Sequence, residues 1–191
     1  MAAKPIFDKV ALIGVGLIGS SMAHAMKRGK VAGHISGYAR RSETLEKAKK
    51  IGFADSLYDS LEPVVKDADL VVLATPVGTY GELAKEIAPF LKKGAIVTDV
   101  GSVKSAVIRD VGPHVPDGVH FVPAHPIAGT EQSGPEAGFA ELFDGRWCIL
   151  TPPTGTDAEA VDKLKSFWQA LGSNVDVMDA HHHDLVLAIT S

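Results

Sequence analysis

A glycine pattern near the start of the chain, Gly14-Val15-Gly16-Leu17-Ile18-Gly19, constrains the fold more than any other feature. It follows a β-branched run at residues 10–13 and opens an amphipathic stretch at residues 17–28, so it stands between a predicted strand and a predicted helix. Here Gly14 permits a tight turn, Gly16 lets the backbone approach a pyrophosphate, and Gly19 lets the helix pack on the strand. The helix N-terminus offers free N–H groups to phosphates. We therefore predict a dinucleotide site at Gly14, Gly16, Leu17, Ile18 and Gly19, with a ligand-free glycine turn as the alternative.

Short β-branched runs alternate with helix-like segments along the chain, the pattern of a parallel sheet covered by helices on both faces. The sequence predicts further strands at residues 35–38, 70–74, 95–99, 120–123, 147–150 and 174–177, and helices at residues 42–50 and 158–171. Ser42 is expected to cap the first of these helices and Gly52 to end it. The predicted fold class is α/β, a doubly wound, Rossmann-type, mostly parallel sheet.

Composition limits the classes of function. The chain has 191 residues, 46% of them hydrophobic, which suits one compact domain with a full core. A net charge of −4 argues against a nucleic-acid-binding or basic membrane surface. No apolar run is long enough to span a bilayer, and the first residues lack a signal-peptide core. The single cysteine, Cys148, cannot form an internal disulfide, so we expect a buried, inert thiol and a cytoplasmic protein.

The end of the second predicted strand bears on cofactor choice. An NAD site usually has an acidic residue there, which binds the ribose 2′-hydroxyl. This chain reads Tyr38-Ala39-Arg40-Arg41-Ser42, with no carboxylate before Glu43. Arg40 and Arg41, with Ser42, could hold a 2′-phosphate, which favours NADP while leaving NAD open; otherwise both arginines are solvated surface charges. Thr75 and Pro76 follow another strand and are expected to shape the cofactor cleft.

Two segments carry residues suited to proton transfer. The first, His125-Pro126-Ile127-Ala128-Gly129-Thr130-Glu131, places an imidazole in a predicted loop, where it could accept and release a proton near neutral pH. The alternative is a structural role, in which His125 lies in a turn and bonds to the backbone. The second segment, residues 98–104, follows a strand; there Ser102 is either a site hydroxyl or a helix N-cap, and Lys104 is expected to be solvated or structural.

A run of histidines stands near the end of the chain, in His181-His182-His183-Asp184. Adjacent helical residues point in different directions and cannot converge on one ion, so we predict no metal site. Asp179 is expected to cap a helix that runs to Ile189 without a stop signal before Ser191. This pattern suggests the start of a second domain, with a short docking helix as the alternative. An apolar face on Leu185, Val186 and Ile189 would favour association.

Three pieces of the sequence together resemble a known family. They are Gly14-Val15-Gly16-Leu17-Ile18-Gly19-Ser20, Asp99-Val100-Gly101-Ser102-Val103-Lys104, and the His125 segment followed by Ser133-Gly134. In this order and spacing they resemble the prephenate/arogenate (cyclohexadienyl) dehydrogenases of tyrosine biosynthesis. The resemblance implies a dinucleotide-binding domain at residues 1–178, then the start of a helical dimerisation domain at 179–191, and a homodimer. The family's further histidine and later arginine, which grips the substrate carboxylate, have no counterpart here.

The resemblance also implies a reaction, the oxidative decarboxylation of prephenate or arogenate. His125 would accept the proton of the substrate's C4 hydroxyl while hydride passes to the nicotinamide, and loss of CO₂ from C1 would aromatise the ring. Ser102 would bond both the imidazole and that hydroxyl, and Thr130 would contact the substrate or the cofactor. Two other readings stay open: a β-hydroxyacid dehydrogenase, which takes its acid–base group from a lysine, and a non-catalytic NADP-binding module.

Overall fold

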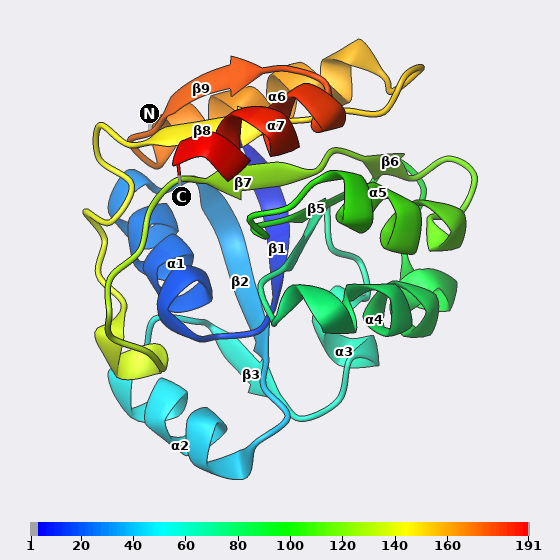
Figure 1. Cartoon of the computed structure of the whole chain (residues 1–191). Coiled ribbons are helices and arrows are strands. Elements are labelled where there is room, and N and C mark those ends of the chain that lie inside the picture. The colour runs from blue at the N-terminus through cyan, green and yellow to red at the C-terminus, as the bar shows by residue number, and fades with distance from the viewer. Residues whose placement is uncertain (1–3, 191) are drawn as a thin grey trace.

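A six-stranded parallel sheet forms the centre of the molecule (Figure 1). The structure, a computed structural model, describes the backbone of residues 4–190 and the side chains of residues 4–188. The strands stand in the order β3-β2-β1-β4-β5-β6. The chain builds the sheet outward from β1 to β3 on one side and from β4 to β6 on the other, so the order changes direction between β1 and β4, which are themselves parallel. This order is typical of the doubly wound, Rossmann-type fold class that the sequence predicted. Its members are β1 (Phe7–Ile13), β2 (Ala32–Tyr38), β3 (Ser56–Tyr58), β4 (Leu70–Leu73), β5 (Ile96–Asp99) and β6 (His120–Phe121).

Helices cover both faces of this sheet because the side chains of its central strands alternate between two cores. Val10 and Leu12 of β1 pack in one core, whereas Ala11 and Ile13 pack in the other. The first core includes residues of α1, α2 and α6, and the second includes residues of α3, α4 and α5. The helices are α1 (Leu17–Gly29), α2 (Ser42–Ile51), α3 (Glu62–Val65), α4 (Tyr80–Ile87), α5 (Ser105–Val111), α6 (Ala158–Ala170) and α7 (Ala180–Thr190).

A second, smaller sheet crosses the end of the first (Figure 1). Its strands are β7 (Ala124–Pro126), β8 (Trp147–Leu150) and β9 (Asn174–Val177), with β7 antiparallel and β9 parallel to β8. The sequence predicted the last two strands correctly but placed His125 in a loop. That placement was wrong, because the residue lies on β7 opposite Ile149. Proline and glycine around so short a strand hid its extended pattern.

Several boundaries differ from the sequence prediction. Ser42 is not the cap of α2: it is the first helical residue, and Arg41 occupies the cap position without a side-chain hydrogen bond. Gly52 ends that helix in the left-handed region at φ 75°, as predicted, and Asp179 accepts a bond from the His182 N–H at the start of α7. β3 and the helices α3, α4 and α5 were not predicted, since each is too short for a clear hydrophobic period.

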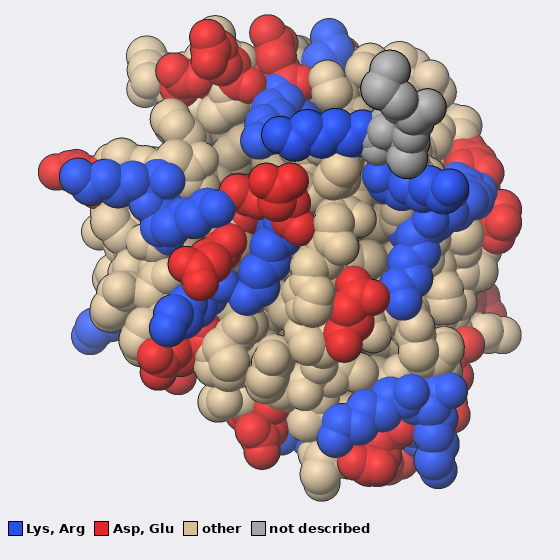
Figure 2. Space-filling view, turned by 180° about the vertical axis from the view of Figure 1, so that it is seen from behind, with Lys and Arg blue, Asp and Glu red and all other residues tan. Residues whose placement is uncertain are grey.

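The surface carries charges of both signs. Figure 2 shows lysine, arginine, aspartate and glutamate side chains interleaved over one face, with no broad area of a single sign. Such a face does not have the clustered positive charge of a nucleic-acid-binding surface. Among the described residues, no helix combines the length and the apolar character that crossing a bilayer requires.

The segment after β7 ties the second sheet to the first helices (Figure 1). It runs past α1 to the short helix η4 (Pro135–Ala137), which lies beside α2. Gly138 is packed so closely on α1 that a Cβ there would lie 2.1 Å from the Ser20 hydroxyl oxygen. The Phe139 N–H donates to the Ser21 hydroxyl at 3.2 Å. The strand that carries His125 is thereby anchored to the helix that follows the glycine pattern.

Candidate active site

The glycine pattern forms an open cradle at the start of α1. A Cβ on Gly14, whose φ is 106°, would lie 2.6 Å from the Ala74 carbonyl oxygen, and one on Gly19 would lie 2.1 Å from the Gly14 oxygen. A Cβ on Gly16 would meet no atom within 4 Å. Gly16 is also the cap residue of α1, where no side chain binds the exposed helix N–H groups. The cradle therefore fits a pyrophosphate, which those N–H groups and the half-buried Leu17 and Ile18 would border.

The predicted cofactor residues on neighbouring strands surround this cradle. β2 and β4 lie on either side of β1. Arg40 and Arg41 follow β2 and are exposed; within the described part of the chain neither guanidinium has an ion pair or hydrogen bond. Thr75, after β4, bonds Thr79 through the two hydroxyls at 2.8 Å, and its methyl group would lie 3.0 Å from a Gly14 Cβ. Pro76 is exposed beside it.

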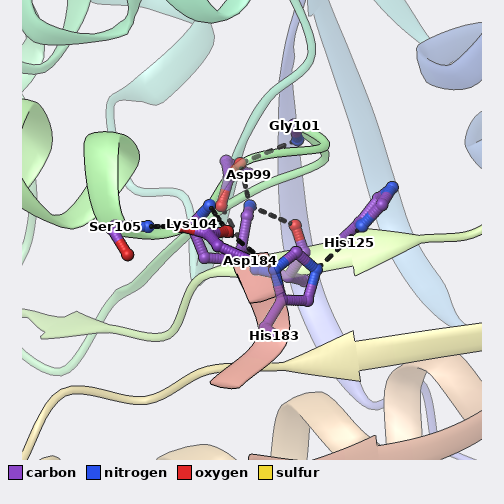
Figure 3. A network of polar contacts seen from close by, with 8 residues as sticks. Asp99, Gly101, Lys104, Ser105, His125, His183 and Asp184 are labelled. Carbon is purple, nitrogen blue, oxygen red and sulfur yellow. Dashed lines mark hydrogen bonds and ion pairs between the residues drawn. The ribbon is translucent and has the colours of Figure 1, made fainter. Parts of the chain in front are cut away.

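A buried ion pair closes the carboxyl end of β5 (Figure 3). The Lys104 ammonium lies 2.5 Å from Asp99 Oδ2, and both side chains are fully buried. Lys104 also donates to the Ala124 carbonyl at 2.7 Å, while the Ala124 and Gly101 N–H groups donate to Asp99. Burial raises the pKa of Asp99 and lowers that of Lys104, and their contact opposes both shifts. The pair therefore fixes β7 against the end of β5. Lys104 thus has a structural role; from the sequence it was expected to be either solvated or structural.

His125 is the next residue along β7 and is itself buried. Its Nδ1 lies 2.9 Å from Nε2 of His183, a fully buried residue of α7 (Figure 3). Burial lowers the pKa of His125 to about 4, and the nearby Lys104 and His183 act in the same direction. The imidazole is therefore neutral at pH 7, the protonation state that a proton acceptor requires.

The start of α5 is bound by a carboxylate from α7. Asp184 accepts the Lys104 N–H at 2.8 Å and the Ser105 N–H at 2.9 Å, and it also contacts His183 Nδ1 at 2.9 Å. Partial burial acts to raise its pKa, but the bonds from Ser105, Lys104 and His183 outweigh burial and lower it. Asp184 thus caps α5 from outside and docks α7 on the loop that holds Lys104.

Ser102 and Thr130 are exposed residues outside the helices and strands. α5 begins at Ser105 with Lys104 at its cap position, so the alternative that Ser102 caps the helix is wrong. Among the described residues no hydrogen bond involves the Ser102 hydroxyl, and the contact of the His125 imidazole with His183 is made through His125 Nδ1. Thr130 accepts the Gln132 N–H at 3.2 Å in a local turn. Their roles toward a substrate remain predictions.

Sequence reasoning missed three members of the network: Asp99, His183 and Asp184. Asp99 ends an apolar strand and stands five residues before Lys104, and this spacing was a usable signal for the buried pair. No local signal marked His183, which lies 58 residues from its partner. In the described part of the chain no group of three or more histidine, cysteine or acidic residues could hold a metal ion, and Cys148 is buried as predicted.

The family model described as "Prephenate dehydrogenase, nucleotide-binding domain" matches residues 22–177. The chain belongs to this family. It is 42% identical over 186 residues to a cyclohexadienyl dehydrogenase of Zymomonas mobilis, covering 97% of this chain and 63% of the relative. It is 35% identical over 185 residues to a prephenate dehydrogenase of Bacillus subtilis, covering 96% and 50%. The chain thus spans half to under two thirds of these relatives.

Solved structures of the prephenate dehydrogenase family show the same fold. The prephenate dehydrogenase of Aquifex aeolicus, in complex with hydroxyphenyl propionate and NAD+, superposes with a TM-score of 0.88 at 35% identity, covering 98% of this chain and 64% of that one. An arogenate dehydrogenase of Synechocystis gives a TM-score of 0.88 at 31% identity, covering 96% and 64%.

Two glycine substitutions separate the binding role of the cradle from its packing role. Gly16→Ala is expected to keep the stability of the wild type, since its Cβ enters open space, but to weaken dinucleotide binding about tenfold or more. Gly19→Ala is expected to destabilise the fold by about 1–3 kcal/mol, because its Cβ meets backbone. Calorimetric titration and urea unfolding measure the two effects. Wild-type dinucleotide affinity in Gly16→Ala would contradict the assignment of the cradle.

Proposed function

We propose that this protein oxidatively decarboxylates prephenate, arogenate or both, with NADP as the preferred cofactor. The observation that carries the proposal is a neutral, buried imidazole at the carboxyl edge of a Rossmann-type sheet, in a chain of the prephenate dehydrogenase family. The relatives named as prephenate, arogenate and cyclohexadienyl dehydrogenases support this choice of substrates.

The proposed chemistry assigns each residue a step. The nicotinamide ring, when bound, supplies the hydride acceptor. His125 takes the proton of the C4 hydroxyl as that carbon is oxidised to a carbonyl. The bond from C1 to its carboxylate then breaks, its electrons aromatise the ring, and the former carbonyl oxygen regains a proton. Ser102, an exposed residue two positions before Lys104, would bond the C4 oxygen and fix its direction, and Thr130 would contact substrate or cofactor from the loop after β7.

The preference for NADP rests on the end of β2. Arg40 and Arg41 present two exposed guanidinium groups there, and no carboxylate follows β2 before Glu43. Guanidinium groups bind phosphate through paired, charge-assisted hydrogen bonds, and Ser42 adds a hydroxyl. The NAD complex of the Aquifex aeolicus relative keeps NAD open as a second cofactor.

We further propose that residues 1–178 are the dinucleotide-binding domain and that residues 179–191 begin a helical domain through which the protein forms a homodimer. Leu185 is 53% exposed on α7, which leaves apolar surface for such packing. Val186 is also partly exposed, whereas the side chain of Ile189 lies outside the described residues. One buried, unpaired thiol, Cys148, supports a cytoplasmic location.

One test of this proposal concerns the reaction itself. The complete gene product, mixed with NADP and either prephenate or arogenate, is expected to form reduced cofactor, measured by its absorbance, and CO₂. His125→Asn is expected to lower turnover by about 10²–10⁴-fold with little change in cofactor affinity, because it removes the proton acceptor. Absence of reduced cofactor with both substrates would contradict the function. Unchanged turnover in the variant would remove His125 from the chemistry.

A separate test concerns the choice of cofactor. Replacing both Arg40 and Arg41 by serine is expected to weaken NADP binding about 10–100-fold and leave NAD binding nearly unchanged, since only the 2′-phosphate loses its partners. The matched control replaces Lys49 and Lys50, at the other end of α2, and removes the same charge. Calorimetric titration with both nucleotides gives the ratio. Equal losses for the two nucleotides, or equal losses in the control, would contradict the assignment.

A further inference from the structure

Two α7 residues, His183 and Asp184, form polar contacts next to His125 that the proposed reaction does not use. His183 is fully buried, although two of its neighbours in the chain, His181 and His182, are exposed on the same helix. Its ring meets the His125 ring at 5.1 Å between centroids, with the planes 69° apart. Figure 3 shows the two imidazoles joined through one nitrogen each, with Asp184 beside them. A buried, polar ring in such a place requires a partner at both nitrogens.

The hydrogen bonds that link Asp184, His183 and His125 can run in only one direction when both imidazoles are neutral. Asp184 Oδ1, whose carboxylate also accepts the Lys104 and Ser105 N–H groups, can only accept. His183 Nδ1 must therefore carry the proton in their 2.9 Å contact. A neutral His183 then has a bare Nε2, so His125 Nδ1 must be the donor in the second contact, also 2.9 Å. His125 Nε2 is left without a proton.

We propose that His183 and Asp184 are positioning residues, which hold His125 in the tautomer protonated at Nδ1 so that its bare Nε2 is the atom that receives the substrate proton. The second half of this statement rests on the proposed function; the tautomer itself does not. A histidine in water prefers the opposite tautomer, with its proton on Nε2. In that tautomer Nε2 could donate to the substrate hydroxyl but could not accept the hydroxyl proton. A base held in its working tautomer by a third group is the logic of the serine-protease triad, here with an imidazole between the base and the carboxylate.

The charges around His125 favour this neutral arrangement. The ionisable groups that face it are Lys104 at the start of α5, His183 and Asp184 on α7, and Cys148 on β8. If His183 carried protons on both nitrogens, its bond with His125 would reverse, whereas its bond to Asp184 would keep its direction. Asp184, whose carboxylate contacts His183, already accepts two backbone N–H groups.

The tautomer is measured directly by ¹⁵N NMR of the imidazoles in histidine-labelled protein at pH 7. The His125 and His183 signals are assigned by their loss in His125→Gln and His183→Gln. The expected spectrum has both rings protonated at Nδ1 and bare at Nε2. A wild-type His125 that carries its proton on Nε2 would overturn the proposal, whatever the variants do.

Variants test whether the arrangement matters for turnover. His183→Leu, in the complete gene product, is expected to lower kcat about 10–100-fold and to leave the cofactor Kd unchanged, since His125 then loses the acceptor that orients it. His183→Gln restores an acceptor oxygen near the same place and is expected to recover most of the loss. His182→Leu, one residue away and exposed, is the matched control and is expected to keep wild-type kcat.

The outcomes separate this proposal from the function on which it rests. A wild-type gene product that oxidises neither prephenate nor arogenate contradicts the function, while the NMR result still decides the tautomer. An active wild type with unchanged kcat and an unchanged pH profile in His183→Leu overturns the positioning role. A loss in His183→Leu that His183→Gln does not recover, in a variant folded as judged by circular dichroism, also overturns it.

Discussion

The ion pair between Asp99 and Lys104 is the interaction on which the site depends. Two buried charges are costly unless further hydrogen bonds support them, and here backbone groups of Gly101 and Ala124 bind the pair. The same bonds fix β7 across the end of β5, so that His125, one residue after Ala124, has little freedom to move. A structural charge pair therefore sets the place of the group proposed to handle the proton.

The loop that contains this pair also receives α7. Asp184 binds the Lys104 and Ser105 N–H groups, so the backbone of Lys104 holds α7 while its side chain holds β7. Three segments that are distant in sequence, the β5–α5 loop, β7 and α7, thus meet within a few hydrogen bonds (Figure 3). Burial at this junction lowers the pKa of His125 and keeps it neutral, and the contact with His183 fixes the orientation of its ring.

The sequence was sufficient for features with a local signal. The glycine pattern, most strands of the sheet, α1, α6 and the importance of His125 all follow from periodicity and motif spacing. Features set by distant contacts could not be predicted from the sequence. His125 was placed in a loop because β7 becomes a strand only by pairing with β8, more than twenty residues later. Residue type alone gave Ser42 a capping role and left capping as one of two alternatives for Ser102. Arg41 and Lys104 occupy those positions, and Asp184 supplies the α5 cap from another helix.

The most direct test of this account is a double-mutant cycle on the buried pair, followed by urea unfolding. Lys104→Met is expected to lower the free energy of unfolding by about 3–5 kcal/mol, because it leaves the Asp99 charge buried alone. Adding Asp99→Asn is expected to cost less than the sum of the two single changes. The half-exposed pair of Lys92 and Asp69 is the control, and Lys92→Met should cost no more than about 1 kcal/mol. A loss below about 0.5 kcal/mol in Lys104→Met, or strict additivity in the cycle, would contradict the central role of the pair.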